Sequence, residues 1–211
     1  MAVAKKTRKV IIFDYDGTIV DSGDLVYKSF NEIAKKYGIK PIKTISKFSE
    51  LYNKNIYDSI VDLGVSRKEL PALINDWRRP FLDPNADVKL FPGMREVLNE
   101  ISKKYIIFVV TSNSTEAIEL SIKRFNLNKI SKVLGAEVST SKVEKIKMIR
   151  EEYPNSDIYY IGDTKGDVIE AKKIGVKIIA VAWGVHSRTQ IERARPDYII
   201  DKPEELLRIL N

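Results

Sequence analysis

Short, continuous apolar runs rich in Val and Ile constrain the fold of this chain more than any other feature of its sequence. Six such runs recur, at residues 10–13, 106–110, 132–138, 158–162, 176–182 and 197–200. Because their hydrophobicity is continuous rather than alternating, they are typical of strands that are covered on both faces. We therefore expect a mostly parallel sheet.

Helical patterns separate several of these runs. Residues 115–125 carry an apolar stripe at helical spacing, with Ser114 before them as a candidate N-cap. Residues 143–149 carry a second stripe, and a third helix follows Pro92. The alternation of strands and helices predicts an α/β fold with a doubly wound, mostly parallel sheet and a Rossmann-like core.

The interval between the first and second apolar runs breaks this alternation. It is about ninety residues long, far more than a single crossover needs. Much of it has helical character without strand signals, in stretches at 24–37, 48–63 and 66–77. We therefore predict an α/β core of residues 1–19 and 91–211, with an inserted α-helical cap domain of residues 20–90.

The absence of some residue types excludes several kinds of site. The chain has no cysteine, which excludes disulfides, thiolate metal sites and a cysteine nucleophile. Its single histidine, His186, cannot form a multi-histidine metal cluster, and we expect it at the surface of a loop. Any metal must therefore bind to oxygen ligands.

No apolar run approaches the ~20 residues that span a bilayer, and the N-terminus lacks the long apolar core of a signal peptide. We therefore expect a cytoplasmic protein that does not interact with membranes, either a monomer or a homodimer.

The charge of the chain favours anionic partners. It has 36 Lys and Arg against 29 Asp and Glu, a formal net charge of +7, which suits nucleic acids or phosphorylated metabolites. The basic residues are scattered, however, and the densest cluster, Lys5, Lys6, Arg8 and Lys9, lies near the chain start. We interpret them as solvated surface and expect no nucleic-acid partner.

Polar side chains follow three of the apolar runs, at the points where the expected strands end. The first run is followed by Asp14, Asp16 and Gly17, the second by Thr111, Ser112 and Asn113, and the fourth by Asp163, Thr164 and Asp167; Lys142 and Lys145 lie near a helix start. In an open α/β sheet, ligands bind beyond the carboxyl ends of the strands. These residues should therefore converge on one edge of the sheet.

Such a group of carboxylates needs a cation. Two like charges about 4 Å apart repel by roughly 4 kcal/mol at an effective dielectric near 20. One lysine does not compensate four aspartates, and Mg²⁺ completed by a phosphate fits better. We therefore predict a magnesium site at the aspartates of these strand ends, namely Asp14, Asp16, Asp163 and Asp167.

Other interpretations of these aspartates are available. A calcium loop beginning at Asp14 would need Gly and Glu where the chain has Ile19 and Leu25. Asp16 and Gly17 could instead form a plain turn. Asp163 and Asp167 could instead have no role beyond capping a helix or stabilising its dipole.

Four segments resemble, in order, the four motifs of the haloacid dehalogenase superfamily. They are FDYDGTIVDS, VVTSNS, STSKVEKIK and YYIGDTKGDV. LFPGMREVLNEI is similar to the re-entry from a helical cap, and the C-terminal part is similar to that of phosphoglycolate phosphatase-like members. The resemblance covers nearly the whole chain, although the lysine segment lacks the Lys-Pro-x-Pro stretch common in those members.

The resemblance implies roles for the matching aspartates. Asp14 would be the nucleophile that attacks phosphorus and forms an aspartyl-phosphate. Asp16 would be the general acid, and its backbone carbonyl would bind Mg²⁺. Asp163 would ligate Mg²⁺ directly, while Asp167 would hold a metal-bound water or the lysine.

The resemblance also implies a phosphate-binding set, namely Ser112, Asn113 and Lys142. Thr111 and Lys145 are the alternatives to Ser112 and Lys142. These groups would neutralise the phosphoryl oxygens.

The function implied is that of a Mg²⁺-dependent phosphatase acting on small phosphorylated metabolites. Asp16 favours phosphoryl transfer over dehalogenation, which does not need an acid at this position. A phosphomutase of the same architecture is the alternative, and a phospho-accepting signalling domain or a nucleic-acid-binding module is less favoured.

The residues that would select the leaving group could lie among Tyr27, Trp77, Arg78 and Arg79 of the cap. A helical Trp is more typical of a core, and paired arginines are more typical of a solvated edge.

Overall fold

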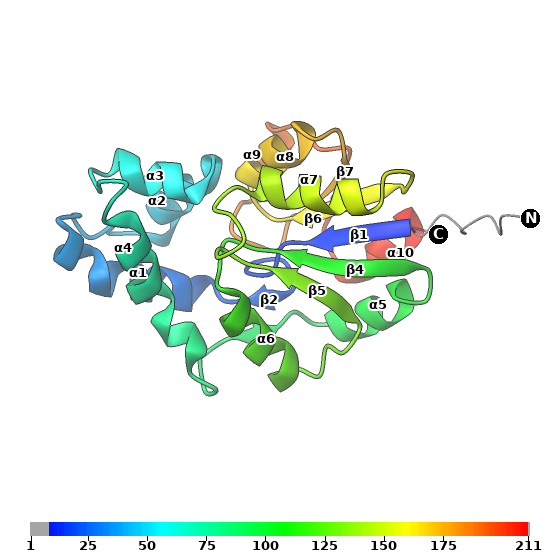
Figure 1. The fold of residues 1–211 in the computed structure, drawn as a ribbon, viewed down its shortest axis with the longest axis horizontal. Helices are drawn as coiled ribbons and strands as arrows, with labels where there is room; N and C mark the ends of the chain where they lie inside the picture. Colours follow the sequence, from blue (N-terminus) through cyan, green and yellow to red (C-terminus); the bar gives the residue numbers. More distant parts are fainter. Residues whose placement is uncertain (1–8, 211) are drawn as a thin grey trace, which may run out of the picture.

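The computed structural model describes residues 9–210, in which the chain forms a six-stranded parallel sheet beside a group of helices (Figure 1). The strand order is β5-β4-β1-β6-β7-β8. The strands are β1 (Lys9–Phe13), β4 (Tyr105–Val110), β5 (Ile130–Leu134), β6 (Ile158–Gly162), β7 (Lys177–Val181) and β8 (Tyr198–Ile200). Since the chain builds outward from β1 first to one side and then to the other, the predicted doubly wound α/β fold is confirmed.

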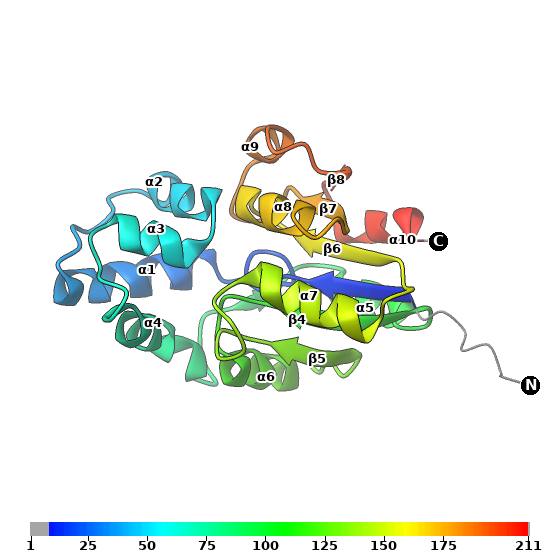
Figure 2. The ribbon, with the colours of Figure 1, turned by 45° about the horizontal axis from the view of Figure 1, so that its top comes forward.

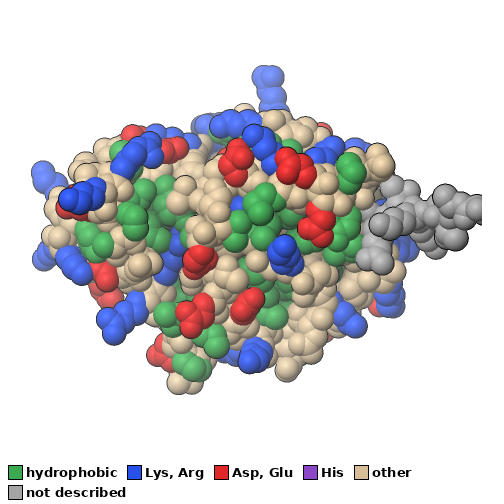
Figure 3. All heavy atoms as spheres, viewed as in Figure 1, with side chains coloured by type: hydrophobic (Ala, Val, Ile, Leu, Met, Phe, Trp, Pro, Cys, Tyr) green, Lys and Arg blue, Asp and Glu red, His purple; other side chains and the backbone are tan. Residues whose placement is uncertain are grey.

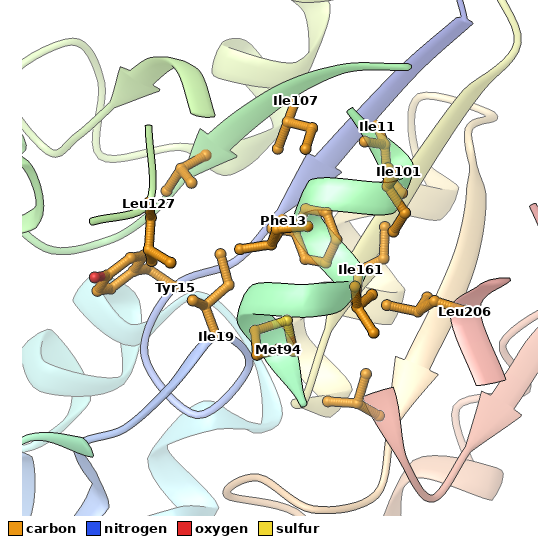
Figure 4. Packing of buried hydrophobic residues seen from close by; sticks show 14 of the residues in the cluster. Ile11, Phe13, Tyr15, Ile19, Met94, Ile101, Ile107, Leu127, Ile161 and Leu206 are labelled. Carbon is orange, nitrogen blue, oxygen red and sulfur yellow. The ribbon is translucent and has the colours of Figure 1, made fainter. Parts of the chain in front are cut away.

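Helices cover both faces of this sheet. One face carries α5 (Met94–Ile101), α6 (Thr115–Arg124) and α10 (Leu206–Ile209), and the other carries α7 (Lys142–Glu152), α8 (Lys165–Lys172) and α9 (Arg188–Glu192). Successive side chains of a strand point to opposite faces. Ile11 and Phe13 therefore pack under α5, as Figure 4 shows, while Val10 and Ile12 pack under α7 and α8.

The third predicted apolar run is displaced in the structure. We expected a strand over residues 132–138, but β5 spans Ile130–Leu134. The chain leaves the sheet at Gly135, where an added Cβ would lie 2.4 Å from the backbone nitrogen of Thr115. Val138 is consequently in a turn and exposed, so apolar character alone placed the end of this strand wrongly.

The helical insertion has its own hydrophobic core. It contains α1 (Gly23–Ala34), α2 (Ile45–Ser49), α3 (Ile56–Asp62) and α4 (Leu70–Arg78), together with short 3-10 turns. Phe30, Phe48 and Trp77 lie at the centre of its buried cluster, so the expectation that Trp77 is a core residue is confirmed. The strand arrows point toward these helices, which lie beyond the carboxyl ends of the strands (Figures 1 and 2).

A two-stranded antiparallel ribbon lies where the chain enters and leaves the insertion. It consists of β2 (Val20–Asp21) and β3 (Lys89–Leu90), with Val20 opposite Leu90. This ribbon lies at the predicted junctions between core and cap. The division at residues 20 and 90 remains our prediction for the domain boundaries.

The second helical stretch of the cap is divided into three parts. We expected helix over residues 48–63, but α2 ends at Ser49, a 3-10 turn spans Glu50–Asn53 and α3 begins at Ile56. Asn55 breaks the stretch because its side chain accepts a hydrogen bond from the backbone N–H of Tyr57, as an N-cap does.

Charges of both signs are interspersed on the face drawn in Figure 3, as expected for a solvated surface. Lys5, Lys6 and Arg8 of the basic cluster lie outside the described residues. Within residues 9–210, none of the helices is both long enough and apolar enough to span a membrane.

Candidate active site

The candidate site lies at the carboxyl ends of three neighbouring strands. Asp14 follows β1, Thr111 follows β4 and Asp163 follows β6. Since β4 and β6 flank β1 in parallel, the three loops meet at one edge of the sheet. A cavity of about 530 Å³ separates this edge from the cap, and we call it the central cavity. Its lining includes Asp14, Asp16, Tyr52, Arg78, Asn113 and Lys142.

Three of the predicted aspartates form a buried cluster. Asp14, Asp163 and Asp167 each offer a carboxylate oxygen, and these atoms lie within 4.8 Å of one another. Lys142 Nζ lies 2.7 Å from Asp14 Oδ2 and 2.6 Å from Asp167 Oδ1. Within residues 9–210 no other cation pairs with this cluster, so three buried carboxylates share one ammonium group.

The pKa values of the cluster depend first on burial and then on the charges of its members. Burial raises the pKa of Asp163 to about 7, and burial likewise raises the pKa of Asp14 well above its usual range. Burial acts in the same direction on Asp167, but Lys142 outweighs it and lowers the pKa of that carboxyl. The pKa of Lys142 is raised, because Asp14 and Asp167 outweigh its own burial. The cluster therefore lacks positive charge.

The donors of this cluster fit Mg²⁺, which prefers carboxylate and carbonyl oxygens. The backbone packs closely against Asp163, because a Cβ on Gly17 would lie 2.2 Å from Asp163 Oδ2 and one on Gly184 would lie 2.3 Å from Asp163 Cβ. Gly17 has a φ of 76°, in the left-handed region that glycine adopts readily. Asp14, Asp163 and Asp167 are thus the side chains that could hold a magnesium ion.

Asp167 has the helix-capping role of the alternative interpretation as well. Its Oδ2 accepts hydrogen bonds from the backbone N–H and the hydroxyl of Thr164, closing a capping box at the start of α8. Its Oδ1 faces Lys142 and also accepts from the Tyr160 hydroxyl. Asp163 does not cap α8, since its carboxylate accepts from Thr18 Oγ1 and from the Val185 backbone N–H.

The carboxylate of Asp16 is separate from the acidic cluster. Its two oxygens accept hydrogen bonds from Ser22 Oγ at 2.7 Å and from Asn113 Nδ2 at 3.1 Å. Burial raises its pKa, which favours the protonated form. The side chain therefore suits proton donation, and a contact of this residue with a metal would have to come from its backbone carbonyl.

The structure separates the two lysine alternatives by what they contact. Lys142 contacts the carboxylates, whereas Lys145 Nζ donates to the backbone carbonyls of Thr111 and Gly135. Burial, with a further contribution from neighbouring Lys142, lowers the pKa of Lys145 to about 7.

The hydroxyl alternatives differ in the same way. Thr111 Oγ1 already accepts from the Asn113 backbone N–H, and Thr111 is buried. The Ser112 hydroxyl makes no hydrogen bond within residues 9–210, and Ser112 lines the central cavity.

His186 is not at the surface as expected. It is fully buried, with Nδ1 accepting from the backbone N–H of Lys165 at 2.8 Å and Nε2 lying 3.0 Å from the Ser49 carbonyl. Since a backbone N–H can only donate, Nε2 carries the proton and donates to Ser49. The loop position was correct, but the cap covers this loop, and no local sequence signal predicts that contact.

The expectation of a solvated edge fails for one of the two arginines. Arg79 is exposed, but Arg78 is buried and lines the central cavity. The two cap tyrosines beside it, Tyr52 and Tyr57, did not emerge from sequence reasoning, because aromatic residues in helical stretches usually belong to a core.

Comparisons with known proteins agree with this geometry. The family model described as haloacid dehalogenase-like hydrolase matches residues 11–181. A phosphoglycolate phosphatase of Synechococcus elongatus is 29% identical over 203 residues, covering 94% of this chain and 95% of that protein. A pyrophosphatase PpaX of Bacillus mycoides is 25% identical, with 95% and 96% covered.

Solved structures share the fold. A haloacid dehalogenase-like hydrolase of Streptococcus pneumoniae superposes with a TM-score of 0.77 at 22% identity, covering 97% of this chain and 99% of that one. A predicted phosphatase of Clostridium acetobutylicum superposes with a TM-score of 0.81 at 22% identity, with the same coverage. With the family model matching most of the chain and the motif residues gathered at one edge of the sheet, this protein is an enzyme of the haloacid dehalogenase-like hydrolase family.

Proposed function

We propose that this enzyme is a Mg²⁺-dependent phosphatase that hydrolyses small phosphorylated metabolites through an aspartyl-phosphate. The observation that carries the proposal is the pairing of buried Asp14 with Lys142 beside a separately held Asp16. The phosphatase and pyrophosphatase names of the two relatives support the same reaction class.

In the first half-reaction Asp14 forms a bond to phosphorus, and the bond between phosphorus and the leaving oxygen breaks. The carboxyl proton of Asp16 passes to that leaving oxygen. Asp16 lies two residues from Asp14, and Ser22 and Asn113 hold its carboxyl group in place. The nucleophile and the acid are therefore distinct groups with distinct environments.

In the second half-reaction the ionised Asp16 takes a proton from water. The water oxygen bonds to phosphorus, the bond from phosphorus to Asp14 breaks, and phosphate leaves. Both aspartates thus return to their starting states, and the net reaction adds one water to the ester.

Lys142, Ser112 and Asn113 are the proposed ligands of the phosphoryl oxygens. The Ser112 hydroxyl and Lys142 both line the central cavity, where fixed donors stabilise the negative charge of a transferring phosphoryl group. When bound at the acidic cluster, Mg²⁺ would supply the positive charge that the cluster lacks.

The test is release of inorganic phosphate from a panel of small phosphate esters, measured with Mg²⁺ and with a chelator. We expect metal-dependent turnover, and Asp14→Asn should lower kcat by roughly 10³-fold or more, as loss of a catalytic nucleophile does. Asp157→Asn is the matched control, because Asp157 is exposed. Turnover without metal, or an Asp14→Asn variant near wild type, would contradict the mechanism. Conversion of a sugar phosphate without phosphate release would favour the phosphomutase alternative.

A further inference from the structure

A buried arginine on the cap side of the central cavity has no carboxylate partner. Arg78, at the end of α4, is 8% exposed. No carboxylate of residues 9–210 lies within 4.0 Å of its guanidinium nitrogens. Burying a charge without a partner is costly, so the location of Arg78 calls for an explanation beyond folding.

The guanidinium group is held in place but is mostly unused. Its Nη2 donates to the Tyr57 hydroxyl, and its Cζ lies 5.5 Å from the centre of the Tyr57 ring. Arginine carries five N–H donors, and this is the only hydrogen bond that its guanidinium makes to the described residues. Most of its donors therefore remain available on the side of the cavity.

Tyr57 connects this arginine to the catalytic edge. Its hydroxyl donates to the backbone carbonyl of Ser112 at 2.8 Å, in the loop that follows β4. The chain from Arg78 through Tyr57 to Ser112 thus orients the guanidinium relative to the proposed phosphate site.

A second cap side chain lines the same cavity with an unused donor. The Tyr52 hydroxyl makes no hydrogen bond within residues 9–210. Burial raises the pKa of Tyr52, so the phenol stays protonated and can donate. Tyr52 and Arg78 both line the central cavity.

We propose that Arg78 and Tyr52 form a subsite for a second anionic group, carried by the leaving group of the substrate. This inference rests on the proposed function and names its substrate class, a small phosphate ester or anhydride with a carboxylate or a further phosphate. Lys142 and Arg78 provide cations on the core and cap sides of one cavity. Its volume of about 530 Å³ suits a small ligand with two anionic ends.

The experiment compares matched substrates, one with and one without a second anionic group. Phosphoglycolate is compared with 2-hydroxyethyl phosphate, and pyrophosphate with methyl phosphate. Arg78→Gln should lower kcat/KM for the members with a second anionic group by roughly 10- to 100-fold, the effect of losing hydrogen bonds to a charged group. It should change kcat/KM for the members whose phosphoryl group is their only anionic group by less than about threefold. The pair that responds shows whether the second anion is a carboxylate or a phosphate.

Arg79→Gln is the matched control, because it removes the same charge from an exposed neighbour. It should leave all four substrates close to wild type. Arg78→Lys keeps the charge but loses the planar fork, so it should recover part of the preference. Tyr52→Phe should reduce the preference by a smaller factor.

An equal fall for both members of each pair would overturn the inference and make Arg78 a structural residue. Thermal unfolding of each variant shows whether Arg78→Gln folds. If it does not, Arg78→Lys and Tyr52→Phe decide, and an unchanged preference in both overturns the subsite. Asp14-dependent hydrolysis without preference for a second anion would refute the subsite alone, whereas no hydrolysis of any ester would refute the proposed function.

Discussion

The two sides of the central cavity are lined by different kinds of side chain. The core side, formed by Asp14, Asp16, Asn113, Lys142 and Asp167, consists of charged or polar groups that follow strands or begin helices. Each of these side chains has a hydrogen-bond partner within the protein. The cap side includes the aromatic rings of Phe48, Tyr52 and Trp77 and two cations, Lys54 and Arg78. Lys54 pairs with Asp62, whereas Arg78 has a single hydrogen-bond partner among the described residues.

The two sides are joined by few contacts. Asn55 donates to the Thr140 carbonyl and to Glu170, Tyr57 donates to Ser112, and His186 donates to Ser49. A Cβ at Gly166 would lie 2.9 Å from the carbonyl oxygens of Tyr52 and Lys54, so the cap lies directly on the start of α8.

From this difference we propose that the core side carries the chemistry and that the cap side selects the leaving group. Strands β1, β4 and β6 are each paired on both sides and so position the side chains that we propose as reactive groups. The cap packs around its own aromatic core, so its residues can contact a leaving group without being part of the sheet. The following predictions test whether chemistry and selection are divided in this way.

The largest effect should come from the core side. Lys142→Met should lower kcat by about 10²- to 10³-fold, because it removes a fixed cation from the phosphoryl site. It should also lower the free energy of unfolding by about 3–5 kcal/mol, since it leaves buried carboxylates without a partner. Steady-state kinetics and urea denaturation measure the two effects. Lys147→Met, at a half-exposed lysine of the same helix, is the control. A wild-type rate in Lys142→Met would assign the phosphate-binding role to Lys145 instead.

The second prediction concerns the stability of the cap. Trp77→Ala should lower the free energy of unfolding of the cap by about 3–5 kcal/mol, as large-to-small changes in a core do, because Trp77 packs 5.0 Å from the Phe30 ring centre. Hydrogen exchange should accelerate in α1 and α4 but not in β1 and β6. Leu63→Ala, at a more exposed cap residue, should have a much smaller effect. Equal acceleration in cap and core would show that the two parts unfold as one unit.

Lys145 provides a pH-dependent test of the core side. Its pKa of about 7 in the folded state lies below its ordinary value of 10.5, because burial disfavours the charged form. Between these pH values the unfolded chain holds a proton that the folded chain lacks, so stability should rise with pH by up to about 1.4 kcal/mol per unit. In urea denaturation, the free energy of unfolding of the wild type minus that of Lys145→Met should therefore increase from pH 7 to 9. A difference independent of pH would mean that Lys145 stays charged when buried.

The smallest expected effect concerns the contact between the two sides. Asn55→Ser keeps an N-cap acceptor for α3 but removes the amide that reaches Thr140 and Glu170. The link contributes about 1 kcal/mol, the usual net value of a hydrogen bond, so KM should rise roughly fivefold or less while kcat changes little. Asn128→Ala, at an exposed turn residue of the core, is the control. A large fall in kcat would show that cap contacts also position the reacting groups.

Sequence reasoning predicted the core side of the cavity far better than the cap side. The apolar runs predicted the sheet, and parallel strands bring the residues after their carboxyl ends together. Asp14, Asp163 and Asp167 therefore converge as expected. Which oxygen of Asp167 closes a capping box and which faces Lys142 could not be predicted, because both roles suit one carboxylate at the start of a helix.

The cap side was predicted poorly for a related reason. Helical spacing identified the cap helices but not their breaks, and it did not distinguish buried Arg78 from exposed Arg79. The burial of His186 was missed for the same reason, because this residue contacts Ser49, which lies far away in sequence.

The amino-acid sequence by itself determined the α/β class, the helical character of the stretch between β1 and β4 and the set of residues at the strand ends. These features depend on local periodicity and on the rule that parallel strands end together. The tertiary structure alone decided which lysine meets the carboxylates, which arginine is buried and which side chains join cap to core. Those contacts depend on distances between segments that no local pattern encodes.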